Sequence, residues 1–171
     1  MMIIQSRRVW IAGQMIPAQM EITEQKITRI LPYGSEIPGR DYGDLRILPG
    51  FIDIHTHGAY GFDTNDADPD GLRYWMEHIP SEGVTAILPT TVTQMPDVLT
   101  KALENVAAVA EEGYRGAEIL GIHLEGPFLD MKYKGAQPPE AMAVPSVEQF
   151  QQYQKAAGGR VRYIALSPEH D

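Results

Sequence analysis

The spacing of hydrophobic and polar positions changes near residue 47. Before that point, short apolar runs alternate with turn residues. Val9 to Ala12 precedes Gly13-Gln14, and the runs Met20 to Thr23 and Lys26 to Leu31 flank Glu24-Gln25. Short β-rich runs separated by polar turns predict strands, and the last two predict a hairpin. We therefore predict a small β module of sandwich type over residues 1–47, too short to close a sandwich by itself.

From residue 48 onward, apolar runs of strand length alternate with apolar stripes of helical period. The runs begin near residues 51, 84, 117 and 161, and the stripes lie between them, for example at Leu72, Trp75, Met76 and Ile79. Such alternation predicts an α/β fold with a parallel sheet and right-handed crossovers. Four regular β/α units suit a (β/α)₈ TIM-type barrel, which needs about 250 residues. We therefore predict that residues 48–171 form the N-terminal half of such a barrel.

Composition narrows the classes of function. The 171 residues carry a net charge of −9 and no cysteine. A phosphate backbone requires clustered Lys and Arg, so no nucleic-acid partner is expected. Without thiolates, any metal must be bound by histidines and carboxylates. The chain shows neither the apolar core of a signal peptide nor an apolar run of membrane-spanning length, so we expect a cytoplasmic protein without a membrane partner.

The first strand of the α/β region ends in two histidines. In the segment Leu48 to Gly61, alternation places Asp53, His55 and His57 on one face. The opposite face, with Ile52 and Ile54, should then pack against helices. The Cα atoms of His55 and His57 should lie about 7 Å apart, and both imidazoles can then reach one metal ion. Histidines near strand ends are also commonly plain hydrogen-bonding residues, so this pattern alone leaves both possibilities open.

A carboxylate ends the third predicted strand. In an α/β barrel the carboxyl ends of the strands share one rim, which should bring Glu125 close to His55 and His57. This set suits zinc, iron or another divalent metal, and such an ion supports metal-assisted hydrolysis. Glu125 alone could equally be a carboxylate that caps a loop. His123 and Asp53 face inward and lie deeper, where each could orient metal ligands or simply be hydrogen-bonded in the core.

Four segments together carry a resemblance to a known family. PGFIDIHTHG, GIHLEGPFLD, KGAQ and ALSPEHD resemble the amidohydrolase superfamily, and within it the deacetylases of N-acetylglucosamine 6-phosphate. The resemblance implies one or two divalent metal ions, with Glu125 as the principal ligand and His55 and His57 holding a further ion. It also implies that Ala136 and Gln137 contact the sugar phosphate, although the family usually has histidine at the position of Gln137.

The reaction implied by the resemblance is hydrolysis of the acetamide of N-acetylglucosamine 6-phosphate to glucosamine 6-phosphate and acetate. The family takes two further histidines and its general base, an aspartate, from later strands that this sequence does not contain. We therefore assign no catalytic residue within the chain and predict little or no activity for it alone. Its open sheet edges should associate with a missing C-terminal half or with a second copy.

Two other interpretations remain. The chain could be an inactive fragment, that is, a module that binds metal or associates without catalysis. It could also be another amidohydrolase, such as a cyclic-amide hydrolase or a deaminase. Members with a carbamylated lysine carry it on the fourth strand, but the segment from Val161 to Asp171 has no lysine. Together with HLEGPF, this weighs against the carbamate-bridged members.

Overall fold

The computed structural model describes residues 1–170 and separates into two compact units. Unit 1 comprises residues 1–49, and unit 2 begins at Gly50. The two units have different sheets, one largely antiparallel and one entirely parallel. The change in sequence period near residue 47 therefore corresponds to a change in the type of strand pairing.

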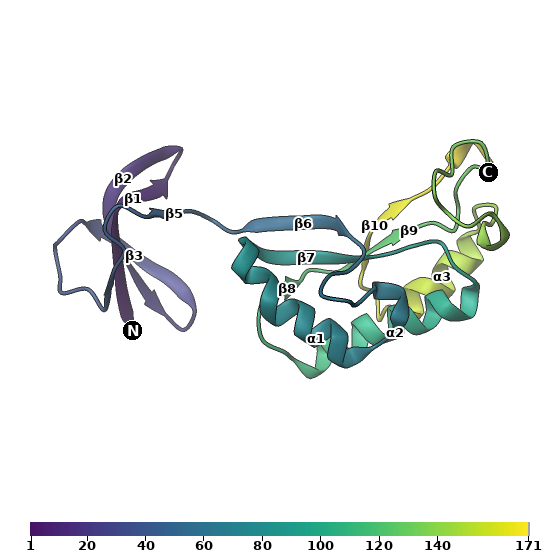
Figure 1. The fold of residues 1–171 in the computed structure, drawn as a ribbon, viewed down its shortest axis with the longest axis horizontal. Coiled ribbons are helices and arrows are strands. Elements are labelled where there is room, and N and C mark those ends of the chain that lie inside the picture. The colour runs from purple at the N-terminus through teal and green to yellow at the C-terminus, as the bar shows by residue number, and fades with distance from the viewer. Residues whose placement is uncertain (171) are drawn as a thin grey trace. The chain divides into compact units, whose positions relative to one another are not determined.

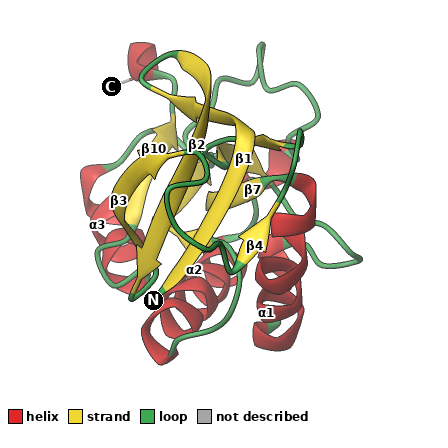
Figure 2. Cartoon of the chain, turned by 90° about the vertical axis from the view of Figure 1, so that its left-hand side faces the viewer, coloured by secondary structure: helices red, strands yellow, loops and turns green. Residues whose placement is uncertain are grey.

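Unit 1 is a five-stranded sheet. Strands β1 (Met2–Ile11), β2 (Gln14–Thr23) and β3 (Lys26–Pro32) pair antiparallel and lie side by side in Figure 2. The short strands β4 (Arg40–Asp41) and β5 (Arg46–Ile47) pair parallel with β1. The predicted hairpin is confirmed as β2–β3.

The turn of that hairpin has a simple backbone explanation. Glu24 and Gln25 have φ values of 50° and 61°, the left-handed conformation that a two-residue turn between twisted strands favours.

The first strand is longer than predicted, because it starts at Met2 rather than at Val9. Its early part was missed because buried polar residues interrupt the apolar pattern. Gln19 is fully buried on β2, and its side-chain amide donates to Gln5 Oε1 at 2.7 Å.

Unit 2 is built on a parallel sheet whose strands follow one another in chain order. Strand β6 (Phe51–Thr56) pairs with β7 (Val84–Thr91), β7 pairs with β9 (Ile122–Glu125), and β9 pairs with β10 (Val161–Ala165). The two-residue strand β8 (Glu118–Ile119) also pairs with β7. The predicted α/β fold with parallel strands is confirmed.

Three helices connect these strands and lie on one face of the sheet (Figure 1). They are α1 (Pro69–His78), α2 (Pro96–Glu112) and α3 (Val147–Ala156). Among residues 1–170, no helix has both the length and the apolar character needed to cross a bilayer. Single 3₁₀ turns occur at Thr64–Asp66, Ile79–Glu82, Pro139–Ala141 and Pro168–His170.

The core of unit 2 lies between the helices and the covered face of the sheet. The helical stripe predicted from the sequence supplies much of it, since Leu72, Trp75 and Met76 are fully buried. These residues pack with others from β7, β9, α2 and α3: Ile87, Leu99, Leu103, Val106, Leu124 and Tyr153. Burial of this apolar surface is the main stabilising contribution to the unit.

Two local predictions are wrong. Ile52 and Ile54 do not pack against helices, because they are 62% and 52% exposed. They lie on β6, which is the end strand of the sheet and is paired on one side alone among the residues that the structure describes. The third predicted strand, which begins near residue 117 and ends at Glu125, is interrupted between β8 and β9, where Leu120 is 41% exposed. There the backbone N–H of Leu120 still donates to the carbonyl of Ile87 at 3.0 Å.

A substitution at Gly116 tests the close packing of the α2–β8 connection against the end of α1. A Cβ on Gly116 would lie 1.8 Å from the Met76 carbonyl oxygen, whereas a Cβ on Gly113 would meet nothing within 4 Å. Both glycines have a left-handed φ, +109° and +84°. Gly116→Ala should therefore destabilise the chain by about 2 kcal/mol more than Gly113→Ala, measured by urea unfolding. Equal losses for the two variants would contradict this packing.

Candidate metal centre

The loop after β6 fixes the position of His57. The carbonyl of His57 accepts hydrogen bonds from the backbone N–H and the hydroxyl of Thr64, both at 2.7 Å. The next residue, Gly58, lies so close to the returning chain that a Cβ there would be 2.0 Å from the Phe62 carbonyl oxygen. The loop therefore folds back immediately after His57 and holds its backbone at the end of the strand.

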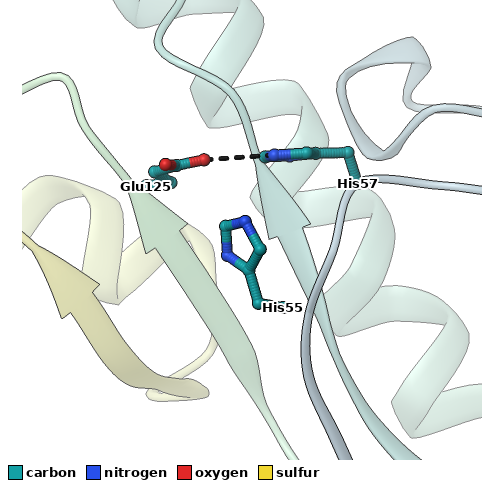
Figure 3. A group of neighbouring side chains, drawn as sticks. All are labelled: His55, His57 and Glu125. Atoms are coloured by element: carbon teal, nitrogen blue, oxygen red, sulfur yellow. Dashed lines mark ion pairs between the residues drawn. The ribbon is translucent and has the colours of Figure 1, made fainter. Parts of the chain in front are cut away.

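Glu125 reaches the same edge because the strands are parallel and in register. It is the last residue of β9, and Thr90 of β7 pairs with His123 two residues before it. One ligand atom each from His55, His57 and Glu125 lies within 4.8 Å of the others. Figure 3 shows the His57 and Glu125 side chains meeting end to end, with the His55 ring beside them. The structure therefore brings these three side chains together.

The hydrogen bonds of His57 determine which nitrogen is available. Its Nδ1 lies 3.2 Å from the carbonyl oxygen of Thr90, and a carbonyl can accept only a proton donor. The proton of neutral His57 is therefore on Nδ1, and Nε2 presents a lone pair. That nitrogen lies 3.1 Å from Glu125 Oε2. The contact lacks hydrogen-bond geometry, and Glu125 Oε2 is buried with no hydrogen-bond partner among the described residues.

These observations fit a cation at this position. A lone-pair nitrogen and a buried carboxylate oxygen that face each other without a proton between them repel, and a shared positive ion removes that repulsion. The two side chains are 34% and 23% exposed, so an ion can reach them from solvent. The residues present therefore suit a divalent metal with nitrogen and oxygen ligands.

His123 lies behind His55, away from solvent. Its Nδ1 is 3.2 Å from Nδ1 of His55 and 3.1 Å from the carbonyl oxygen of Ile54. Burial lowers the pKa of His123, and the neighbouring His55 lowers it further. The ring is 3% exposed, and its Nε2 has no hydrogen-bond partner within residues 1–170. His123 is therefore a neutral imidazole in contact with His55.

Asp53 acts on the backbone of the strand end rather than on an imidazole. Its Oδ1 accepts from the backbone N–H of His55 at 2.9 Å, and its Oδ2 accepts from the hydroxyl of Thr56 at 2.6 Å. Both contacts are local in the sequence. They hold the peptide from which the His55 side chain projects.

Gln137 is an anchor of the long loop after β9. It is buried, and its Oε1 accepts from the backbone N–H of Thr93 at 2.8 Å, which ties this loop to the end of β7. The Nζ of Lys134 donates to the Gln137 carbonyl at 2.9 Å. Ala136, in contrast, is exposed. Sequence reasoning missed the partner Thr93, because nothing in a local pattern links residues that are 44 positions apart.

A second group of potential ligands forms where this loop meets the end of β10. Asp130, Glu169 and His170 each place one ligand atom within 4.8 Å of the others. The His170 ring donates to Asp130, and this hydrogen bond lowers the pKa of the Asp130 carboxyl. Asp130 also accepts from the backbone N–H of Lys132 at 2.6 Å. Asp130 and His170 therefore form a hydrogen-bonded clamp between two loops.

Comparison with known proteins identifies the family. The model of the amidohydrolase family matches residues 46–171, so the chain belongs to that family. It is 45% identical over 143 residues to an N-acetylglucosamine-6-phosphate deacetylase of Bacillus subtilis (strain 168). These residues make up 82% of this chain and 36% of the Bacillus subtilis relative. It is 35% identical to an N-acetylgalactosamine-6-phosphate deacetylase of Escherichia coli O157:H7, over 90% of this chain and 40% of that relative.

Solved structures of deacetylases superpose on the chain. A deacetylase from Mycobacterium smegmatis, in complex with N-acetyl-D-glucosamine-6-phosphate, superposes with a TM-score of 0.90 at 27% sequence identity. The match covers 99% of this chain and 44% of the Mycobacterium smegmatis chain. An N-acetylglucosamine-6-phosphate deacetylase from Thermotoga maritima superposes with a TM-score of 0.72 at 28% sequence identity. The match covers 88% of this chain and 39% of the Thermotoga maritima chain. The chain thus spans less than half the length of these relatives.

Removing the loop anchor should expose the loop. In Gln137→Ala the Thr93 N–H loses its partner, so we expect cleavage by trypsin after Lys132 and Lys134 to become about five- to tenfold faster. Glu140→Ala changes an exposed side chain of the same loop and serves as the control. Equal cleavage rates in the two variants would show that Gln137 does not hold the loop.

The clamp predicts a defined pH dependence. Folding lowers the pKa of the Asp130 carboxyl, so the ionised carboxylate stabilises the folded chain at pH values above its unfolded-state pKa of 3.8. This stabilisation is lost as the pH falls through the folded-state pKa of Asp130. Asp130→Asn should therefore be less stable than the wild type near pH 5, with the difference shrinking toward pH 2, as followed by urea unfolding. Glu140→Gln should show no such trend. A constant difference across this range would contradict the assignment.

Proposed function

We propose that the chain takes part in metal-dependent hydrolysis of the acetamide of N-acetylglucosamine 6-phosphate, which yields glucosamine 6-phosphate and acetate. The observation that carries this proposal is the buried Glu125 oxygen without a hydrogen-bond partner, 3.1 Å from the lone-pair nitrogen of His57. The named activities of the relatives supply the substrate class. The Escherichia coli relative is named for the galactosamine isomer, so both sugar phosphates belong in any assay.

We also propose the fold to which the two units belong. Unit 2 would form the first four β/α units of a (β/α)₈ barrel, and residues 1–47 would belong to a small β-sandwich module. Two observations support the barrel. The strands are adjacent in chain order, and the three helices cover one face, whereas a doubly wound sheet carries helices on both faces. The other face would then be the inside of the barrel, which is where the histidines and Glu125 point.

Glu125, His57 and His55 would hold the metal, zinc, iron or a similar ion, as one or two ions per complete site. When bound, such an ion polarises a carbonyl and lowers the pKa of a bound water. The residues of the chain prepare the site for it. The Thr90 carbonyl orients the His57 ring, and Asp53 holds the peptide of His55. The loop with Ala136 and Gln137 would contact the sugar, and Gln137 also fixes its position.

We assign no general base among residues 1–170. Complete catalysis would therefore need a group from outside these residues, either from the rest of the barrel or from a second copy. The end strands β6 and β10, each paired on one side within the described residues, are the edges through which such a partner would join. The exposed Ile52 and Ile54 on β6 are an apolar surface suited to the same contact.

A second candidate function is a metal-binding or association module without catalysis. The observation that favours it is the same exposure of the β6 edge, because the site of an active amidohydrolase should be enclosed. This candidate and the deacetylase share the metal site and differ in turnover. Metal binding and acetate release must therefore be measured separately.

Metal binding is the first test. After chelation and dialysis, the chain should bind Zn²⁺ in isothermal titration calorimetry, and His57→Ala and Glu125→Gln should each weaken binding by about 100-fold or more. His78→Ala removes an imidazole on α1, where His78 Nδ1 contacts the Tyr74 carbonyl, and should leave binding unchanged. Binding that survives both ligand substitutions would refute the site.

Turnover is the second test. The chain alone should release little or no acetate from either sugar phosphate. Adding the remaining part of the Bacillus subtilis relative as a separate polypeptide should restore acetate release, and Glu125→Gln should abolish it. Turnover by the chain alone would show that no partner is required. Metal binding without turnover in the mixture would favour the non-catalytic module.

A further inference from the structure

The loop that follows His57 is fastened to the neighbouring strand by an asparagine. This inference rests on the metal site proposed above. We propose that Asn65 is a positioning residue for that site. Its side-chain amide ties the loop after β6 to the end of β7, and so holds His57 in place against Glu125 before an ion binds. Asn65 is not itself a metal ligand, because its amide is engaged by the backbone of Val92.

The first step is the pair of hydrogen bonds that Asn65 makes. Its Nδ2 donates to the carbonyl oxygen of Val92 at 2.8 Å, and its Oδ1 accepts from the backbone N–H of the same residue at 3.1 Å. Because a carbonyl can only accept and an N–H can only donate, these partners fix the orientation of the amide. Val92 is the first residue after β7. One side chain therefore satisfies both backbone polar groups at the point where the strand ends.

The second step leads from Asn65 to His57. Thr64 precedes Asn65 in a single 3₁₀ turn, and its backbone N–H and hydroxyl both donate to the His57 carbonyl at 2.7 Å. The His57 ring reaches the same strand, since its Nδ1 lies 3.2 Å from the carbonyl oxygen of Thr90. The loop therefore contacts the end of β7 twice, at Thr90 through the imidazole and at Val92 through the amide. Without the second contact, the imidazole itself would have to hold the loop on β7.

The third step connects the same end of β7 to Glu125. Thr93 lies two residues beyond the strand and is 1% exposed. The residue after Glu125 is Gly126, and a Cβ on Gly126 would lie 2.0 Å from the hydroxyl oxygen of Thr93. The segment just after β7 is therefore in contact with both elements that carry metal ligands. It contacts the loop of His57 through Asn65 and the end of β9 through Thr93.

The effect on an ion follows from preorganisation. The His57 side chain is 34% exposed, so little else restrains it. If the loop were free to move in the metal-free chain, an ion would have to order it, and part of the binding free energy would be lost. Partners that orient metal ligands typically contribute about 10- to 100-fold in affinity. Thr64 and Thr90 still contact His57 when Asn65 is replaced, so we expect a loss at the lower end of that range.

The chain contains a matched control for this pair of hydrogen bonds. Gln154 of α3 holds the backbone of Val161 in the same way: its Oε1 accepts from the N–H at 2.9 Å, and its Nε2 donates to the carbonyl at 3.3 Å. Val161 is the first residue of β10, so this pair lies at the amino end of the sheet, away from the metal site. Asn65 and Gln154 are both half-buried. Asn65→Ala and Gln154→Ala should therefore lose similar stability in urea unfolding.

Zn²⁺ binding to the metal-stripped chain, measured by isothermal titration calorimetry, separates a positioning role from a purely structural one. Asn65→Ala should bind Zn²⁺ about tenfold more weakly than the wild type, and Gln154→Ala should bind it within about twofold of the wild type. Equal Zn²⁺ affinities for these two variants would overturn the inference, because Asn65 would then contribute to stability alone.

A double-mutant cycle tests whether Asn65 acts through His57. If it does, its effect disappears once the imidazole is gone. Asn65→Ala added to His57→Ala should therefore weaken Zn²⁺ binding by less than about twofold. A further tenfold loss in the His57→Ala background would overturn the inference, because Asn65 would then act on the site by another route.

Circular dichroism identifies any variant that fails to fold. If Asn65→Ala does not fold, Asn65→Ser takes its place. A serine hydroxyl can form at most one of the two hydrogen bonds, so Asn65→Ser should weaken Zn²⁺ binding about threefold, and wild-type affinity in it would overturn the inference.

Failure of the metal site and failure of this inference give different results. Wild-type Zn²⁺ affinity in both His57→Ala and Glu125→Gln would refute the metal site and the role of Asn65 with it. Weakened binding in those two variants, together with wild-type affinity in Asn65→Ala, would refute the role of Asn65 alone.

Discussion

The parallel pairing of β6, β7 and β9 is the constraint on which the rest of unit 2 depends. Parallel strands place their carboxyl ends at one edge, so residues that are about 70 positions apart in the chain become neighbours. His57 follows the end of β6, Thr90 lies near the end of β7, and Glu125 ends β9. The central strand supplies the carbonyl that orients an imidazole of one neighbour toward the carboxylate of the other.

Backbone carbonyls thus control the chemistry of the histidines. An imidazole has two nitrogens and, when neutral, one proton, and the nearest carbonyl decides which nitrogen keeps it. Thr90 fixes the proton of His57 away from Glu125. The carbonyl of Ile54 can accept a hydrogen bond from Nδ1 of His123, and the same nitrogen lies 3.2 Å from Nδ1 of His55.

The same sheet combines a well-packed face with an open one. Trp75, Leu72 and their neighbours on the helices cover one face completely, while the end strand β6 leaves Ile52 and Ile54 more than half exposed. Exposed apolar side chains that lie together are unusual on the surface of a monomeric protein and are typical of a contact surface. The candidate metal centre lies at the carboxyl edge of this sheet.

The sequence by itself determined the element types, the family resemblance and the three side chains that meet at the candidate centre. These follow from periodicities of two and 3.6 residues and from short motifs, which are local properties. Only the tertiary structure decided the exposure of Ile52 and Ile54, the break in the third strand, the Gln137–Thr93 anchor and the contact between His123 and His55. Each of these depends on which strand lies at an end or which carbonyl lies opposite a side chain. Such facts exist only after distant segments have paired.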